Sequence, residues 1–148
     1  MTILYTEKLI IRPLQISDSD DVFNYSCTPH VGLCAGWKPH ESKEETIKIM
    51  NEILLNKESV WGIELKENKK VIGSIGLIDD PKRQYDMVKM IGYAAGEAYW
   101  GNGFMTAAVY EVIKFGFYKL NLEAISAYCF PDNERSKKIL QKFNFEYE

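Results

Sequence analysis

The sequence predicts a mixed α/β fold in which helices cover a mostly antiparallel sheet. Two observations lead to this prediction. The strands in the middle of the chain are joined by short polar turns, which favours antiparallel pairing. The last predicted strands alternate with helices, and a strand–helix–strand unit places its two strands parallel. The length of 148 residues suits one domain that covers residues 1–148.

The first half of the chain contains one predicted strand and two predicted helices. Residues 9–14 form an apolar strand that ends near Pro13. Ser17 is the expected N-cap of the next helix, because the acidic residues that follow it suit a helix N-terminus. Residues 29–39 are expected to form a loop. The S-x-x-E pattern that begins at Ser42 then predicts a capping box for a second helix.

The second half of the chain alternates strands and helices. Residues 60–66 and 71–78 are predicted to pair as a hairpin, and residues 88–95 form the next strand. The second hairpin strand is apolar on both faces, which is typical of a central strand. The remaining predicted elements are a helix over 106–120, a strand over 122–130, a helix that begins after Pro131-Asp132-Asn133, and the start of a strand at 145–148.

Composition limits the classes of partner and compartment. The net charge is −3 with acidic and basic residues interspersed, which argues against a nucleic-acid partner. No apolar run is long enough to span a membrane, and the N-terminus lacks a secretion-signal pattern. The chain has no C-x-x-C pattern and only two histidines, so a disulfide framework or a metal site is not expected and the cytoplasm is the expected location. The three cysteines are Cys27, Cys34 and Cys129.

A glycine-rich turn after the strand at 88–95 is the most informative motif. It reads Tyr99-Trp100-Gly101-Asn102-Gly103-Phe104-Met105-Thr106 and leads into a helix. The first N–H groups of a helix have no partner within the helix, and the helix dipole adds positive potential there. Glycines also let a phosphate approach the backbone closely. We therefore expect the turn to bind the pyrophosphate of a nucleotide-tailed cofactor, although similar turns often bind nothing.

A second motif follows in Pro131-Asp132-Asn133-Glu134-Arg135-Ser136 and Leu140-Gln141-Lys142-Phe143-Asn144-Phe145. Together with Ile91-Gly92-Tyr93 and the glycine-rich turn, these segments resemble the GNAT superfamily of N-acetyltransferases. The segment over residues 6–14 and the Ile-Gly-rich strand over 71–77 are similar to segments of the RimJ/RimL-like branch of this superfamily, the ribosomal-protein N-acetyltransferase type. The resemblance implies a GNAT-like fold, with helices on both faces of the sheet and one parallel strand pair that splays apart.

The resemblance implies acetyl-CoA as the cofactor, with coenzyme A as the product. The family motif is Gln or Arg, two residues, Gly, one residue, then Gly or Ala. The three defined positions of this motif fall on Trp100, Gly103 and Met105. Gly103 matches the motif, whereas Trp100 and Met105 depart from it. Ala94 and Ala95 lie at the expected splay point, where their N–H groups are candidates to hold an oxyanion. The expected cofactor-binding residues are Ala94, Ala95, Trp100, Gly101, Asn102, Gly103, Phe104, Met105, Thr106, Asn133 and Ser136, with a helix-cap role as the alternative for Asn133.

The resemblance also suggests one catalytic residue. Many family members protonate the leaving thiolate with a Tyr, but Leu140 occupies that position here. RimL-like members have a Ser where Ser136 stands, so Ser136 is expected to donate to the sulfur, the alternative being a merely buried hydroxyl. The general base is not assigned. The candidates are Glu97, Asp79 and Asp80, which lie near strand ends. The alternative for each is that it is simply a solvated carboxylate in a loop.

Two interpretations are open for several other residues. Trp37 and His40 are expected either to line the acceptor site or, for Trp37, to plug the core. Lys137, Lys138 and Lys142 are expected either to meet the 3′-phosphate of the cofactor or to form a solvated face. Family members add a strand after residues 143–145, so the last strand is expected to be short, missing or supplied by a partner, which leaves a homodimer open.

The sequence therefore predicts an enzyme that transfers the acetyl group of acetyl-CoA directly to an amine, such as a protein N-terminus. A covalent enzyme intermediate is not expected, because no activated Cys or Ser–His pair is present. One alternative is a small-molecule amine as acceptor, such as a polyamine or an antibiotic. Another is a catalytically weak CoA-binding relative. A dinucleotide-binding module is disfavoured, because the chain has only Gly101-x-Gly103 of the G-x-G-x-x-G pattern.

Overall fold

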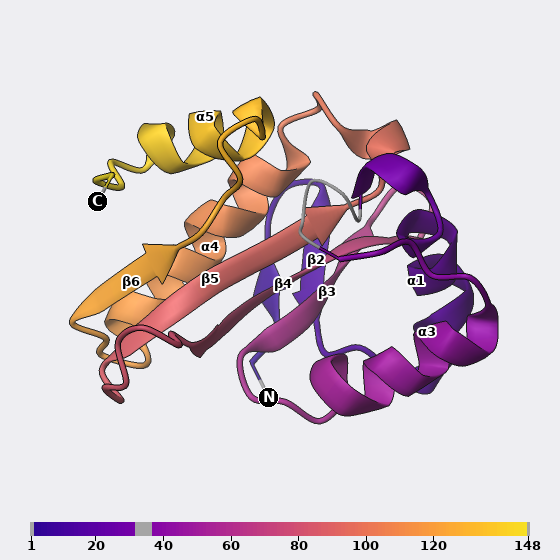
Figure 1. Cartoon of the computed structure of the whole chain (residues 1–148), viewed down its shortest axis with the longest axis horizontal. Helices are drawn as coiled ribbons and strands as arrows, with labels where there is room; N and C mark the ends of the chain where they lie inside the picture. The colour runs from indigo at the N-terminus through magenta and orange to yellow at the C-terminus, as the bar shows by residue number, and fades with distance from the viewer. Residues whose placement is uncertain (1, 32–36, 148) are drawn as a thin grey trace.

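The computed structural model describes residues 2–31 and 37–147. Its centre is a six-stranded sheet with the strand order β1-β2-β3-β4-β5-β6 (Figure 1). All neighbouring strands are antiparallel except β5 and β6, which are parallel. This confirms the mixed sheet with one parallel pair. The strands are β1 (Leu4–Tyr5), β2 (Leu9–Arg12), β3 (Val60–Leu65), β4 (Val71–Asp79), β5 (Val88–Ala95) and β6 (Ala124–Ala127).

Helices pack against both faces of the sheet and form two apolar clusters. Val109 and Val112 of α4 pack with the fully buried Trp61 of β3 in one cluster. Val22 of α1 and Met50 of η2 belong to the other. The helices are η1 (Ile16–Asp18), α1 (Ser19–Ser26), α3 (Lys43–Ile49), the π-helical η2 (Met50–Leu54), η3 (Glu97–Tyr99), α4 (Phe104–Tyr118) and α5 (Glu134–Lys142). No helix within the described ranges is long and apolar enough to cross a membrane.

The predicted N-cap at Ser17 is wrong, whereas the one at Ser42 is confirmed. Ser17 lies inside η1, and the residue at the N-cap position of α1 is Asp18, which follows it directly. The reason is a tertiary ion pair: both carboxylate oxygens of Asp18 accept hydrogen bonds from Arg12 at 2.9 Å, and one also accepts from the Gln15 N–H at 2.8 Å. These bonds fix residues 15–18 in a tighter turn. At the start of α3, Ser42 Oγ accepts the Glu45 N–H at 3.1 Å.

The ends of the chain and its connections differ most from the predictions. The strand β1 was missed, and β6 is shorter than the predicted 122–130. Residues 145–147 are not a strand, so the predicted last strand does not form in this part of the chain. Residues 29–31 are helical rather than a loop. Gly32, Cys34 and Gly36 of the predicted loop, and Glu148, lie outside the described residues.

Candidate functional site

The parallel strands β5 and β6 separate before β5 ends. Their pairing stops at Ile91 and Ala127, while β5 continues through residues 92–95. After β6 the chain leaves the sheet and runs to α5 (Figure 1). A cleft of about 420 Å³ lies where the two strands part. Its lining residues are Val31, Met90, Ile91, Gly92, Tyr93, Ala94, Ala95, Trp100, Met105, Tyr128, Cys129, Phe130, Asn133, Arg135, Ser136 and Ile139.

The glycine-rich turn reaches this cleft through Trp100 and Met105, whereas residues 101–104 and 106 are not among the lining. The turn leads into α4, which begins two residues earlier than predicted. Gly101 and Gly103 have φ angles of +81° and +76°, which side chains with a Cβ rarely adopt. A Cβ at either position would meet no atom within 4 Å, so the space beside the turn is open. The first helical hydrogen bond runs from the Ala107 N–H to the Gly103 carbonyl at 3.1 Å. The N–H groups of residues 104–106 precede that bond and are the ones that can meet an anion.

Two side chains hold the turn in place. Asn102 Nδ2 donates to the Tyr99 and Trp100 carbonyls at 3.1 and 3.3 Å, so this side chain closes the turn. Trp100 Nε1 donates to the Ala95 carbonyl at 2.8 Å. That carbonyl lies beyond the last residue that β6 pairs. The indole N–H therefore satisfies a backbone group that the splay leaves without a strand partner.

The start of α5 places a hydroxyl pair in the cleft. Asn133 is the N-cap of α5, and its Oδ1 accepts the Ser136 N–H at 3.2 Å, which confirms the helix-cap interpretation. Ser136 is only 8% exposed, and its Oγ lies 2.9 Å from the hydroxyl of Tyr93 on β5. Burial raises the pKa of Tyr93, so this hydroxyl keeps its proton at neutral pH. Tyr93 was not among the predicted site residues, although it stands in the Ile-Gly-Tyr segment of the motif.

The three candidate bases lie in very different places. Asp80 is buried and accepts hydrogen bonds from Ser126 Oγ, Tyr128 OH, Arg83 and the Lys82 N–H. These bonds, that from Ser126 above all, hold the pKa of Asp80 well below its usual range, so it is a poor proton acceptor. Glu97 lies outside both pockets and is 2.9 Å from the ring of His30. Asp79 is highly exposed and pairs with Lys89 at 2.6 Å.

A second pocket of about 660 Å³ borders residues 92–94 of β5, which also line the first cleft. Trp37 lines it, whereas His40 does not. His40 is buried, with Nδ1 2.8 Å from Thr46 Oγ1, and its ring lies 5.3 Å from that of Trp37. Burial lowers the pKa of His40, so it acts as a neutral support for Trp37. The lining also includes Glu52, Ile53, Leu54, Lys57, Glu58, Val60, Ser74, Ile75, Gly76, Leu77, Ile78, Asp79 and Lys89.

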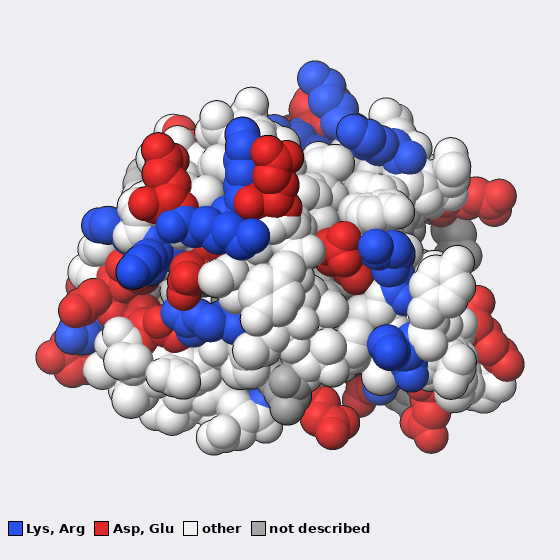
Figure 2. Space-filling model, turned by 180° about the vertical axis from the view of Figure 1, so that it is seen from behind, with Lys and Arg blue, Asp and Glu red and all other residues white. Residues whose placement is uncertain are grey.

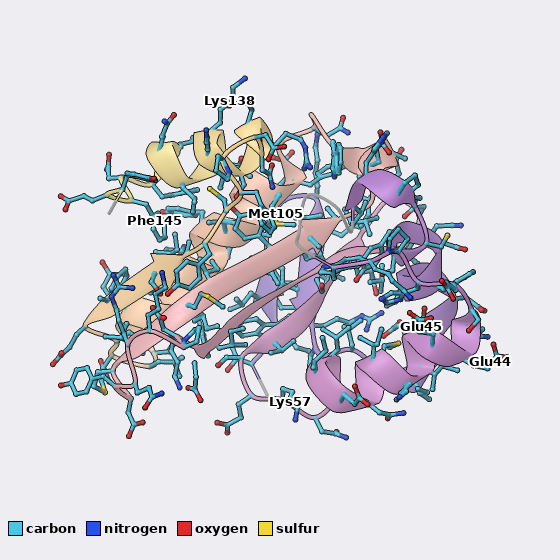
Figure 3. The ribbon with its side chains drawn as sticks, in the orientation of Figure 1. Glu44, Glu45, Lys57, Met105, Lys138 and Phe145 are labelled. Atoms are coloured by element: carbon cyan, nitrogen blue, oxygen red, sulfur yellow. The ribbon has the colours of Figure 1, made fainter. Side chains whose placement is uncertain are left out.

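The remaining charged candidates lie outside the cleft. Lys138 projects from the outer side of α5, whereas Met105 lies between α5 and β5 (Figure 3). Lys137 lies 3.5 Å from Glu134, and Lys142 is not part of the cleft lining. Acidic and basic side chains are interspersed on the face seen in Figure 2, without a continuous basic stripe.

Residues 8–146 match the family model of the acetyltransferase (GNAT) domain. The chain is 32% identical over 154 residues to the "Uncharacterized N-acetyltransferase p20" of Bacillus licheniformis, covering 100% of this chain and 84% of that protein. It is similar to the crystal structure of the ribosomal-protein-S5-alanine acetyltransferase from Vibrio fischeri, with a TM-score of 0.78 and 26% identity, covering 100% of this chain and 85% of that one. The spermidine N-acetyltransferase from Vibrio cholerae, solved with CoA and spermine, has a TM-score of 0.80 at 19% identity, over 97% of this chain and 83% of that one.

Proposed function

The chain belongs to the GNAT acetyltransferase family, whose members use acetyl-CoA, and we propose that it acetylates protein N-terminal amines, as RimJ/RimL-like enzymes do. One observation carries this proposal. The cleft that runs from the glycine-rich turn meets the second pocket at residues 92–94 of β5. An acetyl donor in the cleft and an amine in the pocket would therefore meet across one short piece of strand. Transfer between them needs no covalent enzyme intermediate.

The cleft suits a ligand with an anionic end and an amide-rich arm. The residues that line the cleft include no Asp or Glu, and the charged side chain among them is that of Arg135. The N–H groups at the start of α4 lie at one end, beside open space. The unpaired edge of residues 92–95 offers backbone groups to the amides of a pantetheine arm. We propose that the turn over 100–106 holds the pyrophosphate and that Asn133 lies along the arm.

The alternation of the strand favours one of the two proposed oxyanion donors. The Gly96 N–H donates to the Ile72 carbonyl of β4 at 2.8 Å. Backbone groups of successive residues in a strand point to opposite sides, so the Ala94 N–H also points to β4 and the Ala95 N–H points to the cleft. The Ala95 carbonyl supports this direction, because it accepts a hydrogen bond from Trp100, which lines the cleft. We therefore propose that the Ala95 N–H donates a hydrogen bond to the thioester oxygen. The side chain of Ala94 is small and so leaves space where the cleft and the second pocket meet.

Ser136 is proposed to pass its hydroxyl proton to the leaving sulfur and to take up in exchange the proton that the attacking amine loses. When bound, acetyl-CoA supplies an activated acetyl group and a thiolate leaving group. Ser136 Oγ is buried in the cleft and pairs with Tyr93 OH. With Tyr93 as the donor in that pair, the proton of Ser136 is directed elsewhere and can reach the sulfur. Tyr93 is then a positioning residue that acts through Ser136.

Asp79 is proposed to attract the acceptor rather than to remove its proton. It lies opposite Lys89 on the β4–β5 ladder, four residues from Tyr93. At the usual rise of a strand that separation is about 14 Å, too far for direct proton transfer. The lining also contains Glu52 and Glu58 together with Lys57 and Lys89, so with Asp79 its charged side chains sum to −1, a slight excess of negative charge that favours a cationic amine.

The acceptor class is tested by a mass-shift screen. First, calorimetry should show binding of acetyl-CoA, and not of NAD or ATP, to the folded chain. Peptides with free and with blocked N-termini are then incubated with the enzyme beside spermidine, spermine and an aminoglycoside. Acetylation of free peptide N-termini alone supports the proposal. Acetylation of the polyamines would favour the second candidate, a small-molecule acetyltransferase, which the acidic residues of the pocket support. Binding of acetyl-CoA without thiol release for any amine would identify a CoA-binding relative.

A further inference from the structure

Arg135 is a half-buried cation near the start of α5. It is the second residue of α5 and lines the cleft. Among the described residues no carboxylate lies within ion-pair distance of it, whereas Lys137 and Lys114 each pair with a glutamate on their own helix. A cation that is partly removed from water is costly unless an anion or an aromatic face compensates it. Arg135 therefore depends on an aromatic face for compensation, and none of its N–H groups is taken up by a carboxylate of the described residues.

The indole of Trp100 fixes where this cation lies. The guanidinium carbon of Arg135 is 3.2 Å from the centroid of the Trp100 ring. The ring itself is anchored, because Nε1 donates to the Ala95 carbonyl. A guanidinium stacked on a ring keeps its N–H groups in the plane of the stack, pointing outward, where they can bind a phosphate. Trp100 directly precedes Gly101, so these N–H groups border the open turn at the start of α4.

We infer that Arg135 is a ligand of the CoA pyrophosphate and that Trp100 is its platform. The inference rests on the proposed use of acetyl-CoA. It also explains the departure at position 100. Where the family motif carries Gln or Arg on the turn itself, this chain carries an aromatic ring on the turn and brings the cation to it from α5. The guanidinium would donate to the same phosphates that accept the N–H groups of residues 104–106.

The test compares CoA with 3′-dephospho-CoA, which lacks the 3′-phosphate, and with pantetheine, which lacks the pyrophosphate and the adenosine together. A fourth ligand, 4′-phosphopantetheine, keeps one phosphate without the adenosine, and Arg135→Gln should weaken its binding too if Arg135 meets the phosphates. Affinities are measured by calorimetry, and for weak pantetheine binding by ligand-observed NMR. The variant is Arg135→Gln. The matched control is Lys114→Gln, because Lys114 is also a cation on an aromatic ring, 4.7 Å from the centroid of Tyr110, but lies outside the cleft. Thermal unfolding shows whether each variant is folded, and Arg135→Lys replaces Arg135→Gln if the latter is not.

The expected result is a loss of about 10- to 100-fold in affinity for CoA and for 3′-dephospho-CoA alike, with pantetheine and the control unchanged. An equal loss for pantetheine would overturn the inference, because Arg135 would then only shape the cleft. A loss confined to CoA would assign Arg135 to the 3′-phosphate and would also overturn it, as would no loss at all. Failure of the wild-type chain to bind CoA would instead overturn the proposed function.

A second comparison isolates the platform. Trp100→Phe keeps an aromatic ring and removes the indole N–H, whereas Trp100→Leu removes the ring. Arg135→Gln is expected to retain its effect on CoA affinity in the Phe background and to lose most of it in the Leu background. An effect of the same size in both backgrounds would overturn the role of Trp100 as platform.

Discussion

Replacing Ser136 by Ala removes one hydroxyl from the cleft and leaves the helix that carries it intact. The bond that caps α5 runs from the Ser136 N–H to Asn133 Oδ1, and alanine keeps that N–H. Tyr93→Phe removes the other hydroxyl of the pair and keeps the ring. The two variants and their double variant therefore dissect a single 2.9 Å contact with little change in packing.

The expected magnitudes follow from the roles assigned to the two hydroxyls. A group that transfers a proton in the rate-limiting step contributes about 100-fold or more, so Ser136→Ala should lower kcat by at least about that factor. Tyr93 orients the Ser136 hydroxyl through one buried hydrogen bond. Losing that bond costs about 1 kcal/mol, or about fivefold in kcat. Because Tyr93 acts through Ser136, Tyr93→Phe should have no further effect when Ser136 is already Ala.

The assay follows release of the CoA thiol with a thiol-reactive dye, using the acceptor that the mass-shift screen identifies. The affinity for acetyl-CoA is measured separately by calorimetry and should change little. Tyr110→Phe is the matched control, because Tyr110 is half exposed on α4 and outside the cleft. If the effects of the two variants multiply in the double variant, Tyr93 does not act through Ser136 and its positioning role is refuted. A loss of less than about threefold in Ser136→Ala would show that this hydroxyl supplies only a weak hydrogen bond.

Three further predictions concern the turn, the buried carboxylate and the acceptor pocket. Gly103 has a φ of +76°, so Gly103→Ala should lower the free energy of unfolding by about 1–2 kcal/mol and weaken CoA binding. Denaturant titration and calorimetry measure the two effects, and unchanged values would contradict the proposed role of the turn. The pKa of Asp80 is lowered in the folded chain, so its carboxylate stabilises the fold above its unfolded pKa, and that stability declines as the pH falls from about 4 toward the lowered folded pKa. The melting temperature of Asp80→Asn should therefore be lower than that of the wild type at pH 7, and the difference should begin to narrow only below about pH 4. Asp79→Asn should raise KM for a cationic acceptor about two- to fivefold and leave kcat nearly unchanged, whereas a large fall in kcat would make Asp79 the base.

The central sheet was predictable because its signals are local. Alternating apolar residues and short polar turns placed residues 60–95 in three strands, and those strands are observed with almost the same bounds. The glycine-rich turn was predictable for a similar reason, since a positive φ at Gly101 and Gly103 leaves few other residue types. The predicted cap at Ser17 was wrong because Asp18 bonds to the side chain of Arg12, six residues earlier on β2, and helix-capping preferences do not take such a side-chain pair into account.

The functional groups were harder to predict because they come together from different elements. Ser136 was expected from a resemblance, but its partner Tyr93 lies on β5, more than 40 residues earlier in the chain. Arg135 and Trp100 are also separated by a helix and a strand. Such pairs depend on how far β5 and β6 splay, which no periodicity in either segment encodes. The second pocket likewise needs η2 and β4 to be in place.

The three tryptophans are distributed so that the two halves of the site can be observed optically. Trp100 lines the cleft, and Trp37 lines the second pocket. Trp61 is fully buried, with its indole N–H bonded to the Thr2 carbonyl, so its emission should stay constant. In the Trp37→Phe variant, the change in intrinsic fluorescence would report binding of acetyl-CoA alone. In the Trp100→Phe variant, it would report binding of the amine acceptor alone. Stopped-flow traces of the two variants would then give the order in which the two substrates bind, without any added dye.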